Sequence, residues 1–231
     1  MTIPLPSQQA ITTLFFPGLG ADSTLAKYHC LKEEECLWIE WPQSISPDWD
    51  EFLDSLSEQI PSAGRFRFVG ISFGGLVAMK MAERLKPVGG VFLVGSLIDR
   101  SELRPLFRLL LPWVRWIPTL AFDLRFVPKF VIRHFFGIRE PHHLEDFLVM
   151  ASRLPGRSVK SLCSLLGSWS SIQALAVRRI HGREDRIIQS DSSKATLVQG
   201  GHLISMTHSD EVNAWLESSI FCSLTPPKQP H

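Results

Sequence analysis

The stretch FRFVGISFGGLVAM, residues 66–79, places one hydroxyl group between two apolar runs. The run before it, residues 66–71, has the length and composition of a buried strand. The run after it, residues 74–85, has the spacing of a helix with one polar side. Glycines flank Ser72 at positions 70 and 74, where a side chain would collide with the neighbouring backbone of so tight a turn. The chain therefore passes directly from strand to helix at Ser72.

Short apolar runs of similar length recur along the chain. They are apolar throughout, without the alternation of a half-exposed strand, and this is typical of strands that are covered on both faces. Together with residues 66–71 they predict six strands. The other runs are residues 11–16, 36–41, 88–95, 177–180 and 195–198.

Helical segments with recognisable ends separate these strands. Before the helix predicted over residues 49–60, Ser46 is a candidate N-cap, Pro47 suits a first turn, and Asp48 adds an acidic group near the positive end of the dipole. The last helix begins in the same manner at Ser209. Strands that alternate with helices predict an α/β fold with a doubly wound, mostly parallel sheet of about six strands. Such a sheet carries its active residues at the carboxyl ends of its strands.

Residues 97–175 interrupt this alternation, because no convincing strand occurs in them. Pro112, Pro118 and Pro128 divide part of this segment into short amphipathic helices. We therefore predict an all-helical cap insertion over residues 97–175, and an α/β core formed by residues 1–96 and 176–231. Arginines and a lysine interrupt the apolar stretches of the insertion, so no membrane span is expected.

The charge of the chain is unevenly distributed. The formal net charge of +1 gives no reason to expect nucleic acid as a partner. Residues 97–160, however, carry 11 Lys and Arg against 6 Asp and Glu, which makes +5. This excess predicts either an ordinary solvated face or a docking surface for an acidic carrier protein or an anionic head group.

The four cysteines form neither metal-type pairs nor a disulfide framework, which favours free thiols. The first residues, MTIPLPSQQA, lack the basic start and apolar core of a secretory signal. These features predict a cytoplasmic protein. Adjacent His142 and His143 do not have metal-ligand spacing, and no metal site is predicted.

Ser72 lies in a G-x-S-x-G motif, the strand-turn-helix pattern that lifts a nucleophilic serine clear of a sheet. A serine hydroxyl needs a base to take its proton and a third group to orient that base. His202 follows the last strand and two glycines, which predicts a loop at the carboxyl edge of the sheet, and it is the favoured base. His181 comes directly off a strand and is expected to pack or to form a hydrogen bond in a turn.

Two carboxylates compete for the role of the acid. Asp185 lies in the loop after the penultimate strand, 17 residues before His202, and is the favoured candidate. Asp99 follows another strand end and is its main rival, while Glu184 is adjacent to Asp185 but should point elsewhere. An oxyanion also needs two N–H donors. The backbone amide of Phe73 is the first candidate, and that of Leu19, in the loop PGLGADS, is the second.

The motifs GISFGG, HGREDRI, GGHL and FPGLGAD resemble those of the α/β-hydrolase superfamily, across nearly the whole chain. Within it the chain is similar to small cap-bearing esterases and thioesterases. This resemblance implies a shortened α/β-hydrolase sheet, a helical cap, and a cofactor-free mechanism that uses Ser72, His202 and Asp185. Many members have His-Gly in place of Pro17-Gly18 and proline in place of Gln189.

The combined reading predicts a serine hydrolase that cleaves an ester or thioester of a largely apolar acyl group through an acyl-enzyme on Ser72. The predicted substrate is a small-molecule ester or thioester. One possibility is that the acyl group is carried on CoA or on an acyl carrier protein. An alternative is a weakly catalytic, receptor-like member of the fold. An acyltransferase or a C–C bond hydrolase would use the same three residues.

Overall fold

Six parallel strands form one sheet in the part of the chain that the structure describes. The structure is a computed structural model that describes residues 11–29, 36–172 and 175–224. Across the sheet the order is β2-β1-β3-β4-β5-β6, and every neighbouring pair is parallel. The predicted fold class is therefore confirmed. The strands are β1 (Ile11–Phe16), β2 (Cys36–Trp38), β3 (Arg65–Ile71), β4 (Val91–Val94), β5 (Val177–Gly182) and β6 (Thr196–Val198).

Both faces of the central strands are buried, which explains their uniformly apolar sequences. On β1, Leu14 and Phe16 belong to the core on one face of the sheet, while Phe15 belongs to the core on the other. Val69 lies in register between Phe15 and Phe92 on that second face. A strand covered on two sides has no position for a polar side chain, so the period-two alternation disappears.

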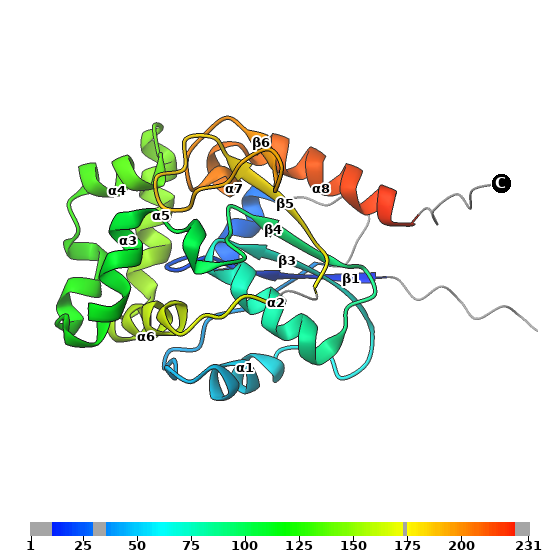
Figure 1. Cartoon of the computed structure of the whole chain (residues 1–231), viewed down its shortest axis with the longest axis horizontal. Helices are drawn as coiled ribbons and strands as arrows, with labels where there is room; N and C mark the ends of the chain where they lie inside the picture. Colours follow the sequence, from blue (N-terminus) through cyan, green and yellow to red (C-terminus); the bar gives the residue numbers. More distant parts are fainter. Residues whose placement is uncertain (1–10, 30–35, 173–174, 225–231) are drawn as a thin grey trace, which may run out of the picture.

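Helices cover the two faces in turn. The first face packs against α1 (Trp49–Ser57) and α2 (Phe73–Leu85). The second packs against the 3-10 helix η1 (Ser23–Tyr28), α7 (Ile204–Thr207) and α8 (Ser209–Leu224). Figure 1 shows the sheet between these layers. No helix of the described residues is long and apolar enough to cross a membrane.

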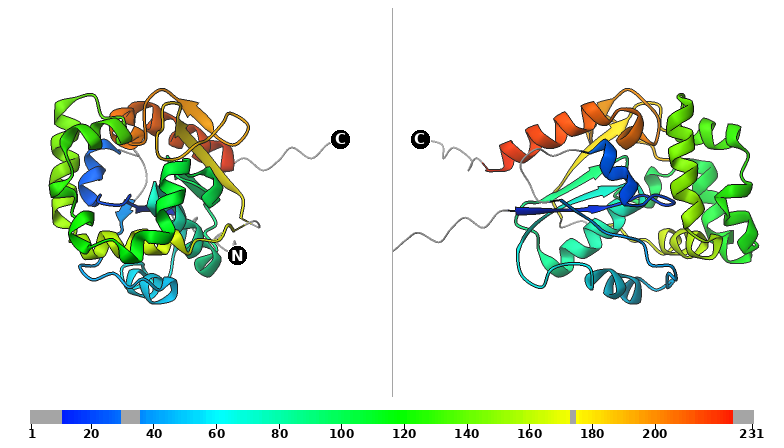
Figure 2. Two further views of the ribbon diagram at one scale, coloured as in Figure 1. Left: turned by 60° about the vertical axis from the view of Figure 1, so that its left-hand side comes forward. Right: turned by 180° about the vertical axis from the view of Figure 1, so that it is seen from behind.

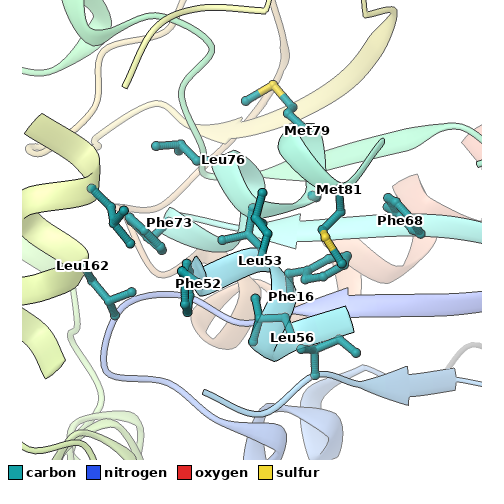
Figure 3. Close-up of a cluster of buried hydrophobic side chains, with 14 of the residues drawn as sticks. Phe16, Phe52, Leu53, Leu56, Phe68, Phe73, Leu76, Met79, Met81 and Leu162 are labelled. Carbon is teal, nitrogen blue, oxygen red and sulfur yellow. The ribbon is translucent and has the colours of Figure 1, made fainter. Parts of the chain in front are cut away.

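The core on the first face is dense and rich in aromatic rings. Phe16 and Phe68 meet edge to face with ring centroids 5.4 Å apart. Figure 3 shows both rings in a cluster that also contains Phe52 of α1 and Met81 of α2. The same cluster includes Leu162, which lies far along the sequence in a helix between β4 and β5. The helical segment therefore shares a core with the sheet.

The helices between β4 and β5, from residue 100 to residue 167, lie beyond the carboxyl ends of the strands (Figures 1 and 2), and we call this segment the insertion. Its described residues form short helices, and Leu103 makes an isolated antiparallel β-bridge with Ile188, which follows β5. Proline occupies the first or second position of three of these helices, where the N–H group that proline lacks would have no acceptor within the helix. The elements are η2 (Arg100–Glu102), α3 (Pro105–Leu110), η3 (Leu111–Trp116), η4 (Thr119–Phe122), η5 (Leu124–Phe126), α4 (Lys129–Phe136), α5 (Pro141–Arg153) and α6 (Gly156–Gly167).

The start of α1 differs from the prediction. The N-cap is Asp48, whose Oδ1 accepts hydrogen bonds from the amides of Asp50 and Glu51 at 2.9 and 3.1 Å. Ser46 instead donates to the Glu51 side chain and accepts from the Asp48 amide. The N-cap is therefore two residues later in the chain than the predicted serine, directly before the exposed N–H groups of the first turn.

A buried histidine makes the stability of this fold sensitive to mild acid. The His29 ring is 5% exposed, and its Nδ1 lies 2.9 Å from Asn213 Oδ1. Burial, opposed by this hydrogen bond, lowers the pKa of His29 from 6.5 to about 4. The unfolded chain therefore takes up a proton at a higher pH than the folded protein does.

We expect the contribution of His29 to stability to be constant above about pH 6.5 and to fall as the pH drops from 6.5 to 4. The loss should reach about 3 kcal/mol. Urea unfolding at several pH values measures it. His29→Gln keeps a donor toward Asn213 and should reduce the dependence of the unfolding free energy on pH between 6.5 and 4. His142→Gln, at an exposed position, should leave this pH dependence unchanged. Equal slopes in all three proteins would contradict the assignment.

Candidate active site

Ser72 lies at the junction of β3 and α2 in a strained backbone conformation, with φ 51° and ψ −120°. Non-glycine residues rarely adopt a positive φ, and such strain persists only where the surrounding structure imposes it. Here the packing is very close: a Cβ on Gly70 would lie 2.4 Å from the Cα of Gly75. A Cβ on Gly74 would lie 2.0 Å from the carbonyl oxygen of Phe16. The glycines thus let α2 start directly against the end of β1.

His202 reaches Ser72 from the opposite end of the sequence. Its Nε2 lies 2.7 Å from Ser72 Oγ, although 130 residues separate the two. The ring is 5% exposed and follows β6 through Gly200 and Gly201. Gly200 has φ +107°, and a Cβ on Gly201 would lie 2.6 Å from the Cα of Gly137 in the insertion. Both glycines are therefore required for the loop that carries His202.

Asp185 lies behind His202. Its Oδ2 is 2.8 Å from His202 Nδ1, and its Oδ1 accepts hydrogen bonds from the amides of Ile187 and Ile188 at 2.7 and 2.9 Å. The residue is 1% exposed. Burial alone would raise the pKa of Asp185, but the charge of His202 and the hydrogen bonds from His181 and His202 outweigh it and hold the pKa well below its usual range. The group facing the imidazole is thus a carboxylate.

The two rival carboxylates lie elsewhere. Asp99 accepts a hydrogen bond from the Ser101 amide at 2.7 Å and forms the N-cap of η2. Glu184 pairs with Arg139 at 2.9 Å on an exposed surface. Of the three acids considered from the sequence, the structure brings only Asp185 to His202.

His181 is a neighbour of the site that the sequence did not reveal. Its Nε2 lies 2.9 Å from Asp185 Oδ2, the same oxygen that faces His202, and both partners are 1% exposed. We predicted that His181 packs or forms a hydrogen bond in a turn, and it is buried against Asp185. The contact with Asp185 could only have been foreseen from the spacing of four residues across the turn after β5.

The start of the insertion holds the loop that carries Asp185. Arg104 donates through Nη2 to the Asp185 carbonyl at 2.9 Å and through its amide to the Ile187 carbonyl at 2.9 Å. The Gln189 amide donates to the Glu102 carbonyl at 2.7 Å. Proline, common at this position in the resembling proteins, has no N–H to make that bond.

Glu102 is itself fixed by a buried ion pair. Its carboxylate bonds both terminal nitrogens of Arg179 on β5, at 3.0 and 2.8 Å. The two side chains are 8% and 2% exposed, respectively. A bidentate pair of this kind fixes orientation as well as position. The insertion is therefore joined to the sheet next to Asp185.

The loop after β1 approaches Ser72 from the other side. A Cβ on Gly18 would lie 3.3 Å from Ser72 Cβ. The Gly18 carbonyl accepts hydrogen bonds from Trp41 Nε1 at 3.0 Å and from the Ala21 amide at 3.1 Å. Trp41 therefore braces this loop, a contact for which the sequence held no signal.

The two predicted oxyanion residues, Leu19 and Phe73, both line a cavity beside Ser72. Phe73 is the first residue of α2, where an N–H group has no acceptor within the helix. Among the main-chain hydrogen bonds of the described residues, none uses the amide of Leu19.

The cavity has a volume of about 290 Å³ and is almost entirely apolar. Ser72 and His202 lie in its wall, and several of its other residues come from the insertion. Cys163 also lines it, and burial raises the pKa of this thiol to about 12, so that it remains protonated. The apolar lining includes Leu25, Ile71, Leu76, Leu97, Leu103, Phe107, Leu110, Leu111, Val114, Ile117, Phe122, Phe136, Phe147, Leu166, Ile187, Ile188, Leu203 and Met206.

A serine at a strand-turn-helix junction, a histidine and a buried carboxylate thus meet at the carboxyl edge of a parallel sheet. The family model described as "Alpha/beta hydrolase family" matches residues 16–215. The chain therefore belongs to the alpha/beta hydrolase family, and the predicted enzyme class agrees with it. A comparison with curated proteins gave no match.

Solved structures of similar fold include several ester-cleaving enzymes. The enol-lactonase from Burkholderia xenovorans LB400 is 13% identical with a TM-score of 0.72, covering 94% of each chain. The N-acyl homoserine lactonase AidH, complexed with N-butanoyl homoserine, is 16% identical with a TM-score of 0.70, covering 97% of this chain and 93% of that one. A lipase-esterase related protein from Clostridium acetobutylicum ATCC 824 is 13% identical with a TM-score of 0.64, covering 91% and 95%. At these identities the similarity concerns the fold.

Proposed function

We propose that this protein is a serine hydrolase that cleaves a carboxylic ester or thioester of a largely apolar acyl group. The observation that carries the proposal is the row of contacts from Ser72 Oγ to His202 Nε2 and from His202 Nδ1 to Asp185, at 2.7 and 2.8 Å, at the wall of an apolar cavity. Acyl transfer to serine requires a nucleophile, its base and a group that orients the base, and these three residues lie in that order.

In the proposed mechanism, Ser72 Oγ attacks the carbonyl carbon while His202 Nε2 takes its proton. The N–H groups of Phe73 and Leu19 hold the oxyanion, and Asp185 stabilises the imidazolium. His202 then gives the proton to the departing alcohol or thiol. A water molecule that His202 deprotonates attacks the acyl-enzyme, and the carboxylic acid leaves as Ser72 regains its proton.

In this proposal residues 97–175 act as a cap that selects the acyl group. This role is supported by the lining of the cavity, because Phe107, Val114 and Leu166 of the insertion line the same cavity as Ser72. The cytoplasmic location and a substrate carried on CoA or an acyl carrier protein stay predictions. Comparing acyl-CoA with simple esters of the same acyl group tests the carrier.

Ser72→Ala should lower the rate of p-nitrophenyl ester cleavage by at least about 10⁴-fold, because the acyl-enzyme can no longer form. A fluorophosphonate probe should label the wild-type protein and not this variant. Ser205→Ala, which removes the other serine hydroxyl that lines the cavity, should still be labelled. Labelling that survives in Ser72→Ala would overturn the proposal, and binding of an ester without turnover would favour the receptor-like alternative.

The size of the cavity predicts a preference for medium acyl chains. Its 290 Å³ equals the space of about ten water molecules in the liquid. Each buried CH₂ contributes about 0.8 kcal/mol, so kcat/KM should rise about fourfold per CH₂ from acetyl to about octanoyl and then level off.

Cys163→Phe, on a cavity-lining position, tests this assignment. It should lower kcat/KM for octanoyl esters and leave acetyl esters within about twofold, because the added ring takes volume that the longer chain needs and the shorter one does not. A profile that is flat from acetyl to octanoyl in the wild-type protein would show that the acyl group does not occupy this cavity.

Trp41→Phe tests the brace of the proposed oxyanion loop. It removes the N–H that holds the Gly18 carbonyl and keeps a ring against Phe73. We expect kcat to fall about tenfold with little change in KM, a smaller loss than the 10²–10³ caused by removing an oxyanion donor. Trp49→Phe is the matched control, because Trp49 also stacks on Phe73 while its buried Nε1 has no partner among the described residues. Equal effects of the two substitutions would contradict the brace.

A further inference from the structure

Large apolar side chains are exposed on one part of the helical insertion. Eight such residues fall between positions 106 and 130, with Trp116 70% and Phe130 73% exposed. Elsewhere in the described residues only Leu85, Val88 and Val149 are comparable. The eight are Leu106, Leu109, Leu110, Trp113, Trp116, Leu120, Phe126 and Phe130. We call them, with the basic residues described next, the outer face.

The exposed charges on this segment are all basic, and one of them, Arg125, is paired with the buried Asp123. Within residues 105–136 five basic side chains are exposed, and the one acidic residue, Asp123, is buried and bonded to Arg125. No exposed acidic group therefore opposes the basic ones within the segment. The basic residues are Arg108, Arg115, Arg125, Lys129 and Arg133.

The basic and apolar side chains are interleaved. The Arg115 guanidinium lies over the Trp116 ring at 5.1 Å, and that of Arg125 lies over Phe126 at 5.9 Å. Phe107 and Phe135 meet edge to face, which joins α3 to α4. Figures 1 and 2 place these helices at the end of the molecule opposite the sheet. Cations and rings are thus presented together on one end.

The outer face is continuous with the cavity. Leu110 is 45% exposed and also lines the cavity that contains Ser72. The same segment therefore has an apolar inner side above Ser72 and an apolar, basic outer side. A surface that held acyl chains against the outer face would bring them to Leu110, a residue of the cavity wall.

This combination fits a lipid surface better than a protein partner. Short helices that carry Lys or Arg beside Trp, Phe and Leu lie in the plane of a bilayer interface, where rings enter the acyl boundary and cations meet anionic head groups. The centre of a protein interface, in contrast, is depleted in charged residues. A second copy of this chain would bring like charges together across a two-fold axis.

We infer that the outer face docks on the surface of a bilayer that contains anionic phospholipid, without a spanning helix. The docking itself is independent of catalysis. Its use, the delivery of an acyl ester to Ser72, rests on the function proposed above.

Vesicle flotation tests the docking. The full chain should bind vesicles of phosphatidylcholine and phosphatidylglycerol at 7:3 and should bind pure phosphatidylcholine far less. The variant Arg108→Ala, Arg115→Ala, Lys129→Ala should bind the anionic vesicles about 100-fold less, at about fivefold for each charge. Raised salt should weaken wild-type binding in the same direction.

The apolar residues are tested separately. The variant Trp113→Ser, Trp116→Ser, Phe130→Ser should lose binding at least tenfold, because each ring contributes buried area at the interface. The matched control is Leu85→Ser, Val88→Ser, which removes exposed apolar side chains outside the insertion and should bind as the wild-type protein does. Far-UV circular dichroism of each variant shows that it is folded.

Ser72→Ala separates this inference from the proposed function, because it should bind vesicles as the wild-type protein does. If the wild-type protein binds vesicles but cleaves no ester, the docking stands and the proposed hydrolase function is overturned. If it cleaves esters but binds no vesicles, the hydrolase function stands and the docking is overturned. Binding that is unchanged in the apolar variant, or an outer face that binds only an acidic carrier protein or a second copy, would also overturn the docking.

Discussion

The close packing at Ser72 is the constraint on which the rest of this structure depends. Because Gly74 has no side chain, the first turn of α2 lies against the carbonyl groups at the end of β1. One steric contact therefore sets three positions: the Ser72 hydroxyl, the Phe73 amide at the start of the helix, and the loop that begins at Pro17. The strained φ of Ser72 is the conformational cost of this arrangement.

On the side of the site that holds His202 and Asp185, glycines again allow two backbone segments to come into close contact. A Cβ on Gly182 would lie 2.2 Å from the carbonyl of Gly201, so β5 and the loop that carries His202 are nearly in backbone contact. Asp185 then connects this loop to β5, because one oxygen faces both histidines and the other accepts two amides. Its position depends on the insertion as well, through Arg104 and the ion pair of Glu102 with Arg179.

The insertion thus has three surfaces with different physical characters. Its base is polar and ionic, and it fixes the loop of Asp185. Its inner side is apolar and closes the cavity above Ser72. Its outer side is apolar and basic, which is unusual for a surface that faces only water. In our proposals the inner side selects the acyl group, and the outer side docks on the bilayer surface from which the acyl ester is taken.

The sequence by itself determined the parallel sheet, the strand-turn-helix at Ser72 and the order of Ser72, Asp185 and His202. These follow from local patterns, because a buried strand, a glycine turn and a helix end each leave a signal within a few residues. Only the tertiary structure showed that Asp185, and not Asp99, lies beside His202, and only it revealed the contacts of His181 with Asp185 and of Trp41 with Gly18. It also showed which aromatic rings of the insertion are buried and which are exposed. These are distances between segments far apart in the chain or across a turn, and they depend on how helices and loops pack, which no local pattern encodes.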